Sequence, residues 1–89
     1  MSIEHNELLA IAQEECAEVI QAISKIMRFG LDTVYKDECN KDHLEEEIGD
    51  LMCMFEIMQE SNIIDWAKVS VASSRKRKKL AKWSDVLGK

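Results

Sequence analysis

The chain contains no proline and only three glycines, and this shortage of helix-breaking residues constrains the fold more than any other feature. Proline removes a backbone donor and glycine makes an ordered backbone more costly in entropy, so both residues commonly interrupt helices. The apolar residues also recur at steps of three and four positions, which is the period of one helix face. We therefore expect an all-α fold built from long helices.

The first expected helix spans about residues 3–28. Ser2 suits its N-cap position, and Glu4 and Glu7 suit the positive end of the helix dipole. Gly30 suits the position just after the helix, where a positive φ angle is common. The apolar face of this helix comprises Leu8, Leu9, Ala12, Cys16, Val19, Ile20, Ile23, Ile26 and Met27.

Residues 31–41 have no clear period, so we expect a loop there, and its length favours a functional role. The second expected helix spans about residues 43–61, with Asp42 as the N-cap and Glu45 completing a capping box. Its apolar residues cover most of its circumference, which indicates burial by a subunit interface, a ligand pocket or both. They are Leu44, Ile48, Leu51, Met52, Met54, Phe55, Ile57 and Met58.

The third expected helix spans about residues 66–82, and Asp65 suits its N-cap. Its second half carries an unbroken basic run from Arg75 to Lys79. One short terminal turn is expected to begin at Ser84 and Asp85, so the prediction is a small bundle of three main helices plus that turn. The apolar side of the third helix is formed by Trp66, Val69, Ala72 or Ser73, and Leu80.

The size of the chain points to a single small domain covering residues 1–89, of which 46% are apolar. Domains of this size bury a small share of their surface and often gain stability by oligomerising. One copy has too few helices to cover both sides of the second helix. We therefore expect at least a homodimer, with a homotetramer as the larger alternative.

The sequence also bears on the compartment. No apolar stretch approaches about 18 residues, so we expect no membrane-spanning helix. The first residues include Glu4 and Glu7 and lack the basic and apolar regions of a signal peptide. Three cysteines without a C-x-x-C pair argue against a disulfide framework and against a thiolate zinc site. A reducing cytoplasm is the simplest setting for such a chain.

The net charge of −5 conceals two regions of opposite sign. Residues 1–65 hold 16 acidic and 4 basic residues, whereas residues 66–89 hold 8 basic residues and 1 acidic residue. An acidic body with a basic tail suits a metal site combined with an anion-binding arm. The same asymmetry also suits attraction between the two ends, within one chain or between chains.

The acidic body carries one pattern twice, 32 positions apart, as Glu14-Glu15-Cys16-Ala17-Glu18 and Glu46-Glu47-Ile48-Gly49-Asp50. Acids three positions apart project from the same side of a helix. Each pattern lies within an apolar stripe of helical period. Two such acidic pairs facing each other would bring four carboxylates around one point.

The helical period places Glu15 and Glu18 at the edge of one apolar stripe, and Glu47 and Asp50 at the matching edge of the other. The first acid of each pattern lies further outward. Four carboxylates around one point repel each other unless a cation is bound. Ligands that are all oxygen favour Mg²⁺, with Mn²⁺ as the close substitute.

The acidic pairs also suit two other interpretations. The pairs could be ordinary solvated surface acids, although their matching register beside matching stripes makes this less economical. A di-iron carboxylate bundle needs Glu-x-x-His on its helices. The residue three positions before His43 is Asn40 and the one before His5 is Ser2, so the iron interpretation does not fit.

These segments resemble the MazG-like all-α nucleotide pyrophosphohydrolases, and most closely their short, phage-type members. The resemblance covers about residues 8–55 and rests on an E-E-x-x-E pattern followed by E-x-x-D. The basic residues ahead of Phe29-Gly30 add to it, whereas the C-terminal third is similar only as a basic helix. The matching segments are Glu14–Ala22, Ser24–Gly30 and Leu44–Leu51.

The resemblance implies hydrolysis of a nucleoside triphosphate between its α- and β-phosphates, which gives the monophosphate and pyrophosphate. A metal-activated water would attack phosphorus, and a carboxylate would take its proton. The sequence does not choose among three candidates for that carboxylate. The implied roles are Mg²⁺ binding by Glu15, Glu18, Glu47 and Asp50, proton acceptance by Glu14, Glu15 or Glu18, and nucleotide contact by Lys25 and Arg28.

Several alternatives stay open. Lys25 and Arg28 also suit a purely structural role as cations near a helix C-terminus. The basic run suits a solvated helix face, and it also adds Lys76 and Lys79 as candidates for phosphate contact across a subunit boundary. A non-enzymatic module would instead use this basic helix to bind nucleic acid or a protein, with salt-dependent affinity. Within enzymes, a phosphoribosyl-ATP pyrophosphohydrolase-like activity is separable only by its substrate.

Overall fold

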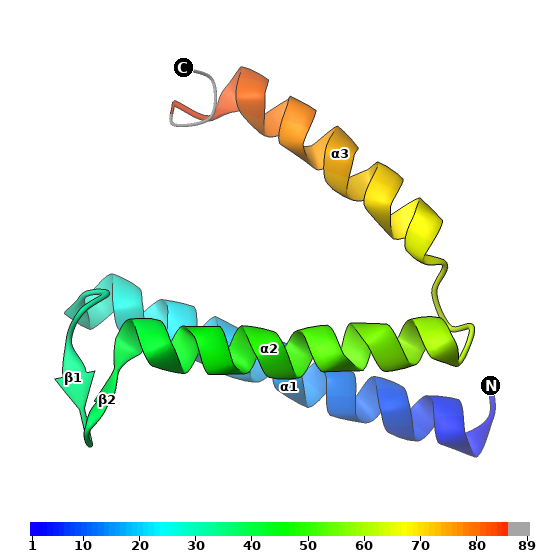
Figure 1. Ribbon diagram of the computed structural model, residues 1–89, viewed down its shortest axis with the longest axis horizontal. Helices are drawn as coiled ribbons and strands as arrows, with labels where there is room; N and C mark the ends of the chain where they lie inside the picture. Colours follow the sequence, from blue (N-terminus) through cyan, green and yellow to red (C-terminus); the bar gives the residue numbers. More distant parts are fainter. Residues whose placement is uncertain (86–89) are drawn as a thin grey trace.

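The computed structural model describes residues 1–85 and contains three main helices joined by short connections (Figure 1). The elements, in chain order, are α1 (Ile3–Phe29), β1 (Val34–Tyr35), β2 (Glu38–Cys39), α2 (Asn40–Glu60) and α3 (Trp66–Trp83). The all-α prediction is confirmed, since the only strands within residues 1–85 are two residues long. No helix among the described residues is long and apolar enough to cross a membrane.

The first helix follows its predicted boundaries closely. The Ser2 side chain caps α1 by accepting a hydrogen bond from the His5 backbone N–H at 3.0 Å. Gly30 ends the helix with a φ of 103°, and its N–H donates to the Ile26 carbonyl at 2.8 Å. A side chain at position 30 would be strained at this φ angle, so glycine is well suited to end α1.

The predicted loop at residues 31–41 contains a small β-hairpin instead of irregular chain alone. Its antiparallel strands pair Val34 with Cys39 and Tyr35 with Glu38. The two turn residues, Lys36 and Asp37, have φ angles of 53° and 63°, as a type I′ turn requires. Lysine is not a usual residue at such a position, so this turn has no clear signal in the sequence.

The second helix begins at Asn40, earlier than the predicted start at residue 43, and it is not capped by Asp42. Cys39 holds the N-cap position and makes no capping hydrogen bond through its side chain. The preceding backbone replaces a side-chain cap, because the Asn40 N–H donates to the Thr33 carbonyl and the Lys41 N–H donates to the Leu31 carbonyl. These bonds satisfy amide groups that otherwise lack partners at a helix start.

The core lies between α1 and α2, which run antiparallel and side by side (Figure 1). Its buried apolar residues are Ala12 and Ala22 on α1 and Met54 on α2. Two alanines on the α1 face allow α2 to approach closely, which brings the polar residues at the edge of the contact near each other. The α1–α2 pair therefore positions any site that lies along this edge.

The third helix stands apart from the α1–α2 pair (Figure 1). Its boundaries follow the prediction, and the Asp65 carboxylate caps it by accepting from the Ala67 N–H at 3.0 Å. The Trp66 N–H donates to the Gln59 side chain at 2.6 Å, which ties the start of α3 to the end of α2. No residue of α3 is buried. The predicted terminal turn at Ser84 and Asp85 would continue into residues 86–89, which lie outside the described residues.

Candidate active site

Two rows of side chains, most of them polar, line the contact between α1 and α2, with one row on each helix. Because the helices are antiparallel, the start of one row faces the end of the other, and Ala22 lies buried in the middle. Both rows step by three and four positions, so each keeps to one helix face. The rows are Glu15, Glu18, Ala22, Lys25 and Phe29 on α1, and Asp50, Glu47, His43 and Asn40 on α2.

Three carboxylates meet at one end of these rows. Glu15 from α1 and Glu47 and Asp50 from α2 each offer an oxygen, and these oxygens lie within 4.8 Å of one another. We call this group the carboxylate cluster. Glu15 and Glu47 are half-buried, whereas Asp50 is exposed. An all-oxygen donor set of this kind suits a hard divalent cation.

The electrostatics of the cluster also favour a cation. The pKa of Glu47 is raised above its ordinary value, first by burial and then by the negative charge of Glu18. Asp50 and Glu15 raise it further, and His43 opposes them. Burial and like charges both disfavour the ionised carboxylate. A bound divalent cation would remove this cost, so the chemistry of the donors fits a metal.

The structure brings together three of the four predicted metal ligands in the carboxylate cluster. Glu18 is outside the cluster by this distance, yet its charge acts on Glu47, so it lies beside the site. Glu14 is exposed and is not part of the cluster. Glu15 and Glu18 are therefore better placed than Glu14 to act on a water at the site.

A second polar cluster, which the sequence did not predict, lies next to the first. It consists of Glu38 from β2 with His43 and Glu46 from α2. His43 Nδ1 lies 3.1 Å from Glu38 Oε1, and His43 Nε2 lies 3.7 Å from Glu47 Oε1. His43 thus links the hairpin to the carboxylate cluster. The pKa of Glu46 is raised, mainly by the charge of Glu38. Only the spacing of four residues between His43 and Glu47 could have signalled this contact.

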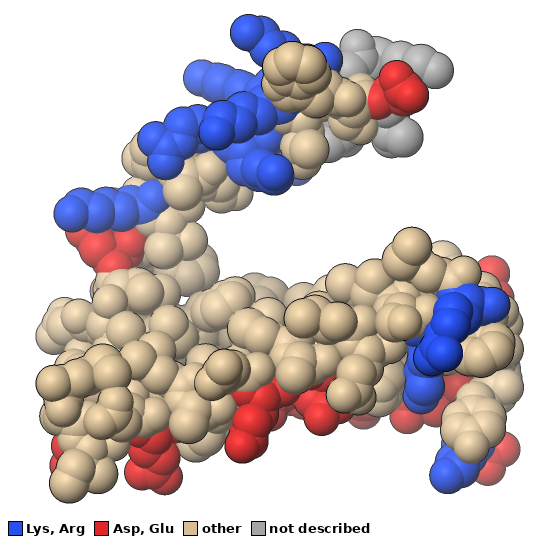
Figure 2. All heavy atoms as spheres, turned by 180° about the vertical axis from the view of Figure 1, so that it is seen from behind, with Lys and Arg blue, Asp and Glu red and all other residues tan. Residues whose placement is uncertain are grey.

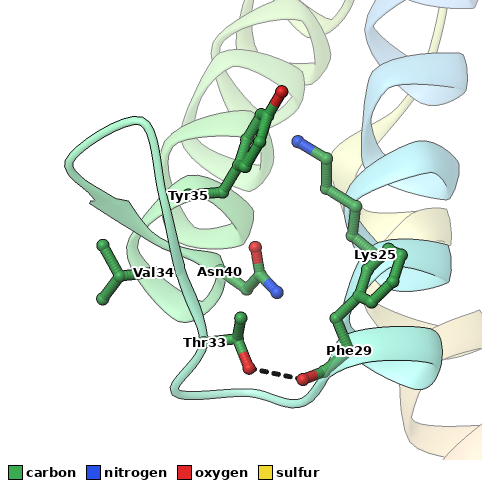
Figure 3. Close-up of a pocket in the computed structure, with 6 residues that line it drawn as sticks. All are labelled: Lys25, Phe29, Thr33, Val34, Tyr35 and Asn40. Carbon is green, nitrogen blue, oxygen red and sulfur yellow. Dashed lines mark hydrogen bonds between the residues drawn. The ribbon is translucent and has the colours of Figure 1, made fainter.

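A pocket of about 480 Å³ lies at the other end of the rows, between the end of α1 and the hairpin (Figure 3). Lys25, a predicted nucleotide contact, lines it, and its ammonium nitrogen lies 5.6 Å from the centre of the Tyr35 ring. Arg28, the other predicted contact on α1, does not line this pocket. Its guanidinium carbon lies 5.2 Å from the centre of the Phe29 ring. The lining residues are Lys25, Phe29, Thr33, Val34, Tyr35 and Asn40.

The basic side chains of α3 lie apart from the carboxylate cluster. Figure 2 shows lysines and arginines gathered over α3, and a row of acidic side chains along the edge of the α1–α2 pair that faces away from α3. Lys76 and Lys79 are exposed, and Lys76 lines only a shallow hollow formed by residues of its own helix. One copy of the chain therefore does not bring either lysine to the α1–α2 contact.

Comparison with known proteins accounts for this arrangement. The family described as the MazG nucleotide pyrophosphohydrolase domain matches residues 3–83, a range that includes all three helices and the hairpin. No curated protein and no solved structure gives a significant match. The members of this family are hydrolases that act on the acid anhydride bonds of nucleoside triphosphates, and they are typically metal-dependent. The chain thus belongs to the MazG nucleotide pyrophosphohydrolase family.

Proposed function

We propose that this chain hydrolyses a nucleoside or deoxynucleoside triphosphate to the monophosphate and pyrophosphate, with Mg²⁺ bound at the carboxylate cluster. The observation that carries this proposal is the convergence of Glu15, Glu47 and Asp50 within 4.8 Å across the α1–α2 contact. The raised pKa of Glu47 supports it, because burial first, and then the negative charge of Glu18, disfavour the ionised carboxylate, and a bound cation would offset both.

Magnesium is the cation that best fits this set of ligands. Mg²⁺ commonly binds through a few carboxylates and completes its shell with waters and substrate phosphates. Glu15, Glu47 and Asp50 would hold it, and Glu18 would be the fourth ligand after a small movement of its exposed side chain. Mn²⁺ has similar ligand preferences, so it would substitute.

The reaction needs a nucleophile, a proton acceptor and neutralisation of the leaving group. The bound metal would lower the pKa of a water and neutralise phosphate charge. Among the chain's own groups, Glu15 and Glu18 are placed to accept the proton of that water, and Glu14 comes after them because it lies outside the cluster. Which of these acids accepts the proton is open to test by single substitutions.

Basic residues would stabilise the charge that develops on the leaving pyrophosphate. Lys25 lies on the same α1 face as the acids, about two helical turns beyond Glu18 and about three beyond Glu15, so it is the first candidate. Arg28 comes after it, because Arg28 does not line the pocket between the end of α1 and the hairpin. Lys76 and Lys79 would reach the phosphates only from a second copy of the chain, because α3 stands apart from the site in one copy.

We also propose that the chain works as a homo-oligomer, at least a dimer. The apolar faces of the helices are poorly covered in one copy: Met27 is 82% exposed, and α3 buries no residue at all. A second copy would cover these faces. Sedimentation at micromolar concentration should show a species heavier than the 10.2 kDa chain. A stable monomer would contradict this part of the proposal.

The compartment remains a prediction. Cys16, Cys39 and Cys53 are all free, and Cys16 and Cys53 are exposed. Free exposed thiols persist best in a reducing environment. We therefore propose a cytoplasmic setting.

The substrate assay that tests the proposal combines a nucleotide panel with a choice of metal. Pyrophosphate release would be measured for canonical and modified ribo- and deoxyribonucleoside triphosphates and for phosphoribosyl-ATP, with Mg²⁺, with Mn²⁺ and with a chelator. We expect release from at least one triphosphate with Mg²⁺, a similar or lower rate with Mn²⁺, and none with the chelator. Turnover that persists in the chelator would contradict the metal role, and turnover of phosphoribosyl-ATP alone would replace the proposed substrate class.

A further inference from the structure

Two neighbouring hollows lie beside the hairpin, on the side of α2 where the carboxylate cluster begins. We call the larger one the hairpin pocket. The larger one, of about 480 Å³, is the pocket between the end of α1 and the hairpin. The smaller one, of about 250 Å³, shares Lys25, Tyr35 and Asn40 with it and adds Glu38 and His43 to the lining. His43 in turn lies 3.7 Å from Glu47 of the cluster. A ligand bound at the cluster can therefore extend along the α1–α2 contact into the pocket.

The spacing along α2 suits the dimensions of a nucleotide. Asn40 in the pocket and Glu47 in the cluster are seven positions apart on one face of the helix. At a rise of 1.5 Å per residue this separation is about 10.5 Å along the helix axis. A sugar bridges a comparable gap between the reacting phosphate of a nucleotide and the far edge of its base. Lys25 lies between the two ends of this path.

The pocket walls suit a flat heteroaromatic ring. Phe29 and Tyr35 supply aromatic surface from α1 and β1, and Val34 adds aliphatic surface (Figure 3). Tyr35 is 60% exposed in the free chain, so its ring is open to a ligand. Bases stack on aromatic side chains without regard to the particular base, because every base has a π face.

One polar group is held in place inside this apolar wall. Asn40 is only 5% exposed, and its Nδ2 donates to the Gly30 carbonyl at 3.0 Å. This bond fixes the amide, and its oxygen is directed into the space between Tyr35 and Lys25 (Figure 3). A carbonyl oxygen accepts hydrogen bonds, so it suits a ring N–H or an amino group.

We propose that the hairpin pocket is the nucleobase subsite of this enzyme, with Tyr35 stacking on the base and Asn40 Oδ1 accepting a hydrogen bond from it. The inference rests on the proposed function, since it takes the ligand at the cluster to be a nucleotide. The hairpin then has a role beyond joining two helices: it supplies Val34 and Tyr35 to the wall of the subsite. The pocket shares Lys25, Tyr35 and Asn40 with the hollow that His43 lines, and His43 contacts Glu47 of the cluster, which favours the substrate itself as the occupant.

The test compares a substrate that has a base with one that lacks it. Wild type, Tyr35→Ala and Tyr35→Phe would be assayed with the best triphosphate of the panel and with ribose 5-triphosphate. We expect Tyr35→Ala to raise KM for the nucleotide by about 5- to 150-fold, the range that stacking one base on one aromatic ring supplies. It should leave kcat nearly unchanged and should not alter kcat/KM for the substrate without a base. Tyr35→Phe keeps the ring and should resemble wild type.

Other results would overturn the subsite. An equal loss on both substrates would mean that Tyr35 has a structural role, and no change on either would mean that the base lies elsewhere. A shift of Tyr35→Ala toward smaller species in sedimentation would assign the pocket to a partner copy. If wild type hydrolysed no triphosphate, the proposed function would fail, and the pocket would still be tested by binding of the four deoxynucleoside monophosphates. In that experiment, NMR shifts at Tyr35 and the Asn40 amide should exceed those at Trp66, and equal shifts would contradict the subsite.

Discussion

The α1–α2 pair and α3 are both amphipathic, yet they use their polar residues differently. In the pair, Ala12 and Ala22 of α1 and Met54 of α2 are buried against each other's helix, and three acids at the edge of this contact converge on one point. In α3 no apolar residue is buried, and among the described residues no lysine or arginine pairs with an acid within 4.0 Å. One copy therefore assembles the carboxylate cluster, whereas it leaves the apolar face of α3 uncovered, which is the face that the proposed second copy would cover. Substitutions in each region can test this division.

The largest effect is expected at the carboxylate cluster. Glu47→Gln removes one ligand charge while keeping the size of the side chain, so turnover should fall by at least about 100-fold, beyond the usual effect of losing a residue that only supports a ligand. The fold should survive, because the Glu47 carboxylate is disfavoured by its surroundings in the metal-free chain. Steady-state kinetics and circular dichroism would measure the two quantities.

The matched control on the same helix is Glu56→Gln, since Glu56 is exposed and outside the cluster. It should leave turnover at the wild-type level. Comparable activity in Glu47→Gln and Glu56→Gln would show that the cluster is not the active site.

The next effect concerns the face of α3 that we expect to meet a partner. Val69 shares a helix face with Trp66 and Leu80, whereas Val71 lies on the opposite face beside Arg75 and Lys78. Val69→Glu would bury a charge in the interface and should weaken self-association by about tenfold or more, a loss of at least ~1.4 kcal/mol. Val71→Glu introduces the same change on the other face and should have little effect. Analytical ultracentrifugation over a concentration series would measure both, and equal behaviour of the two variants would argue against this interface.

A smaller effect is expected in the pH dependence of stability without metal. Glu47 has a pKa above its ordinary 4.5 because of burial and the charges of Glu18, Asp50 and Glu15, which outweigh the opposing His43. The folded chain then binds more protons than the unfolded chain as the pH rises above about 4.5. The free energy of unfolding should therefore fall across this window and level off above the folded pKa. Urea denaturation with a chelator between pH 4 and 7 would show the fall.

Mg²⁺ should reduce or reverse this slope, because a cation at the cluster competes with protons for the same oxygens. Glu47→Gln should flatten the slope in the chelator. Any pH slope of the free energy of unfolding that remains in Glu47→Gln would come from Glu46, whose pKa is raised chiefly by Glu38. A slope that rises with pH in the wild-type chain without metal would contradict the account.

The smallest effect is expected where the hairpin is tied to α1. Asn40→Ala removes the hydrogen bond to the Gly30 carbonyl, which should lower the free energy of unfolding by about 0.5–1.5 kcal/mol. Lys41→Ala, at the exposed neighbouring position, should change stability less. Urea denaturation without nucleotide would compare them. Equal stabilities would mean that the backbone bonds at the start of α2 hold the hairpin by themselves.

The same division governs what the sequence could predict. The boundaries of α1 and α3 follow from caps at Ser2 and Asp65, and each cap is a local signal. The start of α2 does not follow from a local signal. Its first amides bond to the carbonyls of Leu31 and Thr33, and only the folded connection brings these carbonyls near. The hairpin was missed for a related reason, since Lys36 offers no turn signal.

The candidate site divides in the same way. Glu15, Glu47 and Asp50 could be chosen from helical period alone, because two antiparallel stripes bring matching edges together. Tyr35 and Asn40 could not be chosen from the sequence, because their place in the pocket depends on a turn with two positive φ angles. Residues on regular helices were predictable, and those placed by the hairpin were not.

The central claim is that the metal binds at the carboxylate cluster and not at the neighbouring group of Glu38, His43 and Glu46. The most direct test is the affinity of the chain for Mn²⁺, measured by electron paramagnetic resonance for wild type, Glu15→Gln and Glu38→Gln. The account predicts that Glu15→Gln weakens Mn²⁺ binding by at least about tenfold and that Glu38→Gln leaves it close to wild type. Loss of binding in Glu38→Gln with unchanged binding in Glu15→Gln would contradict the account.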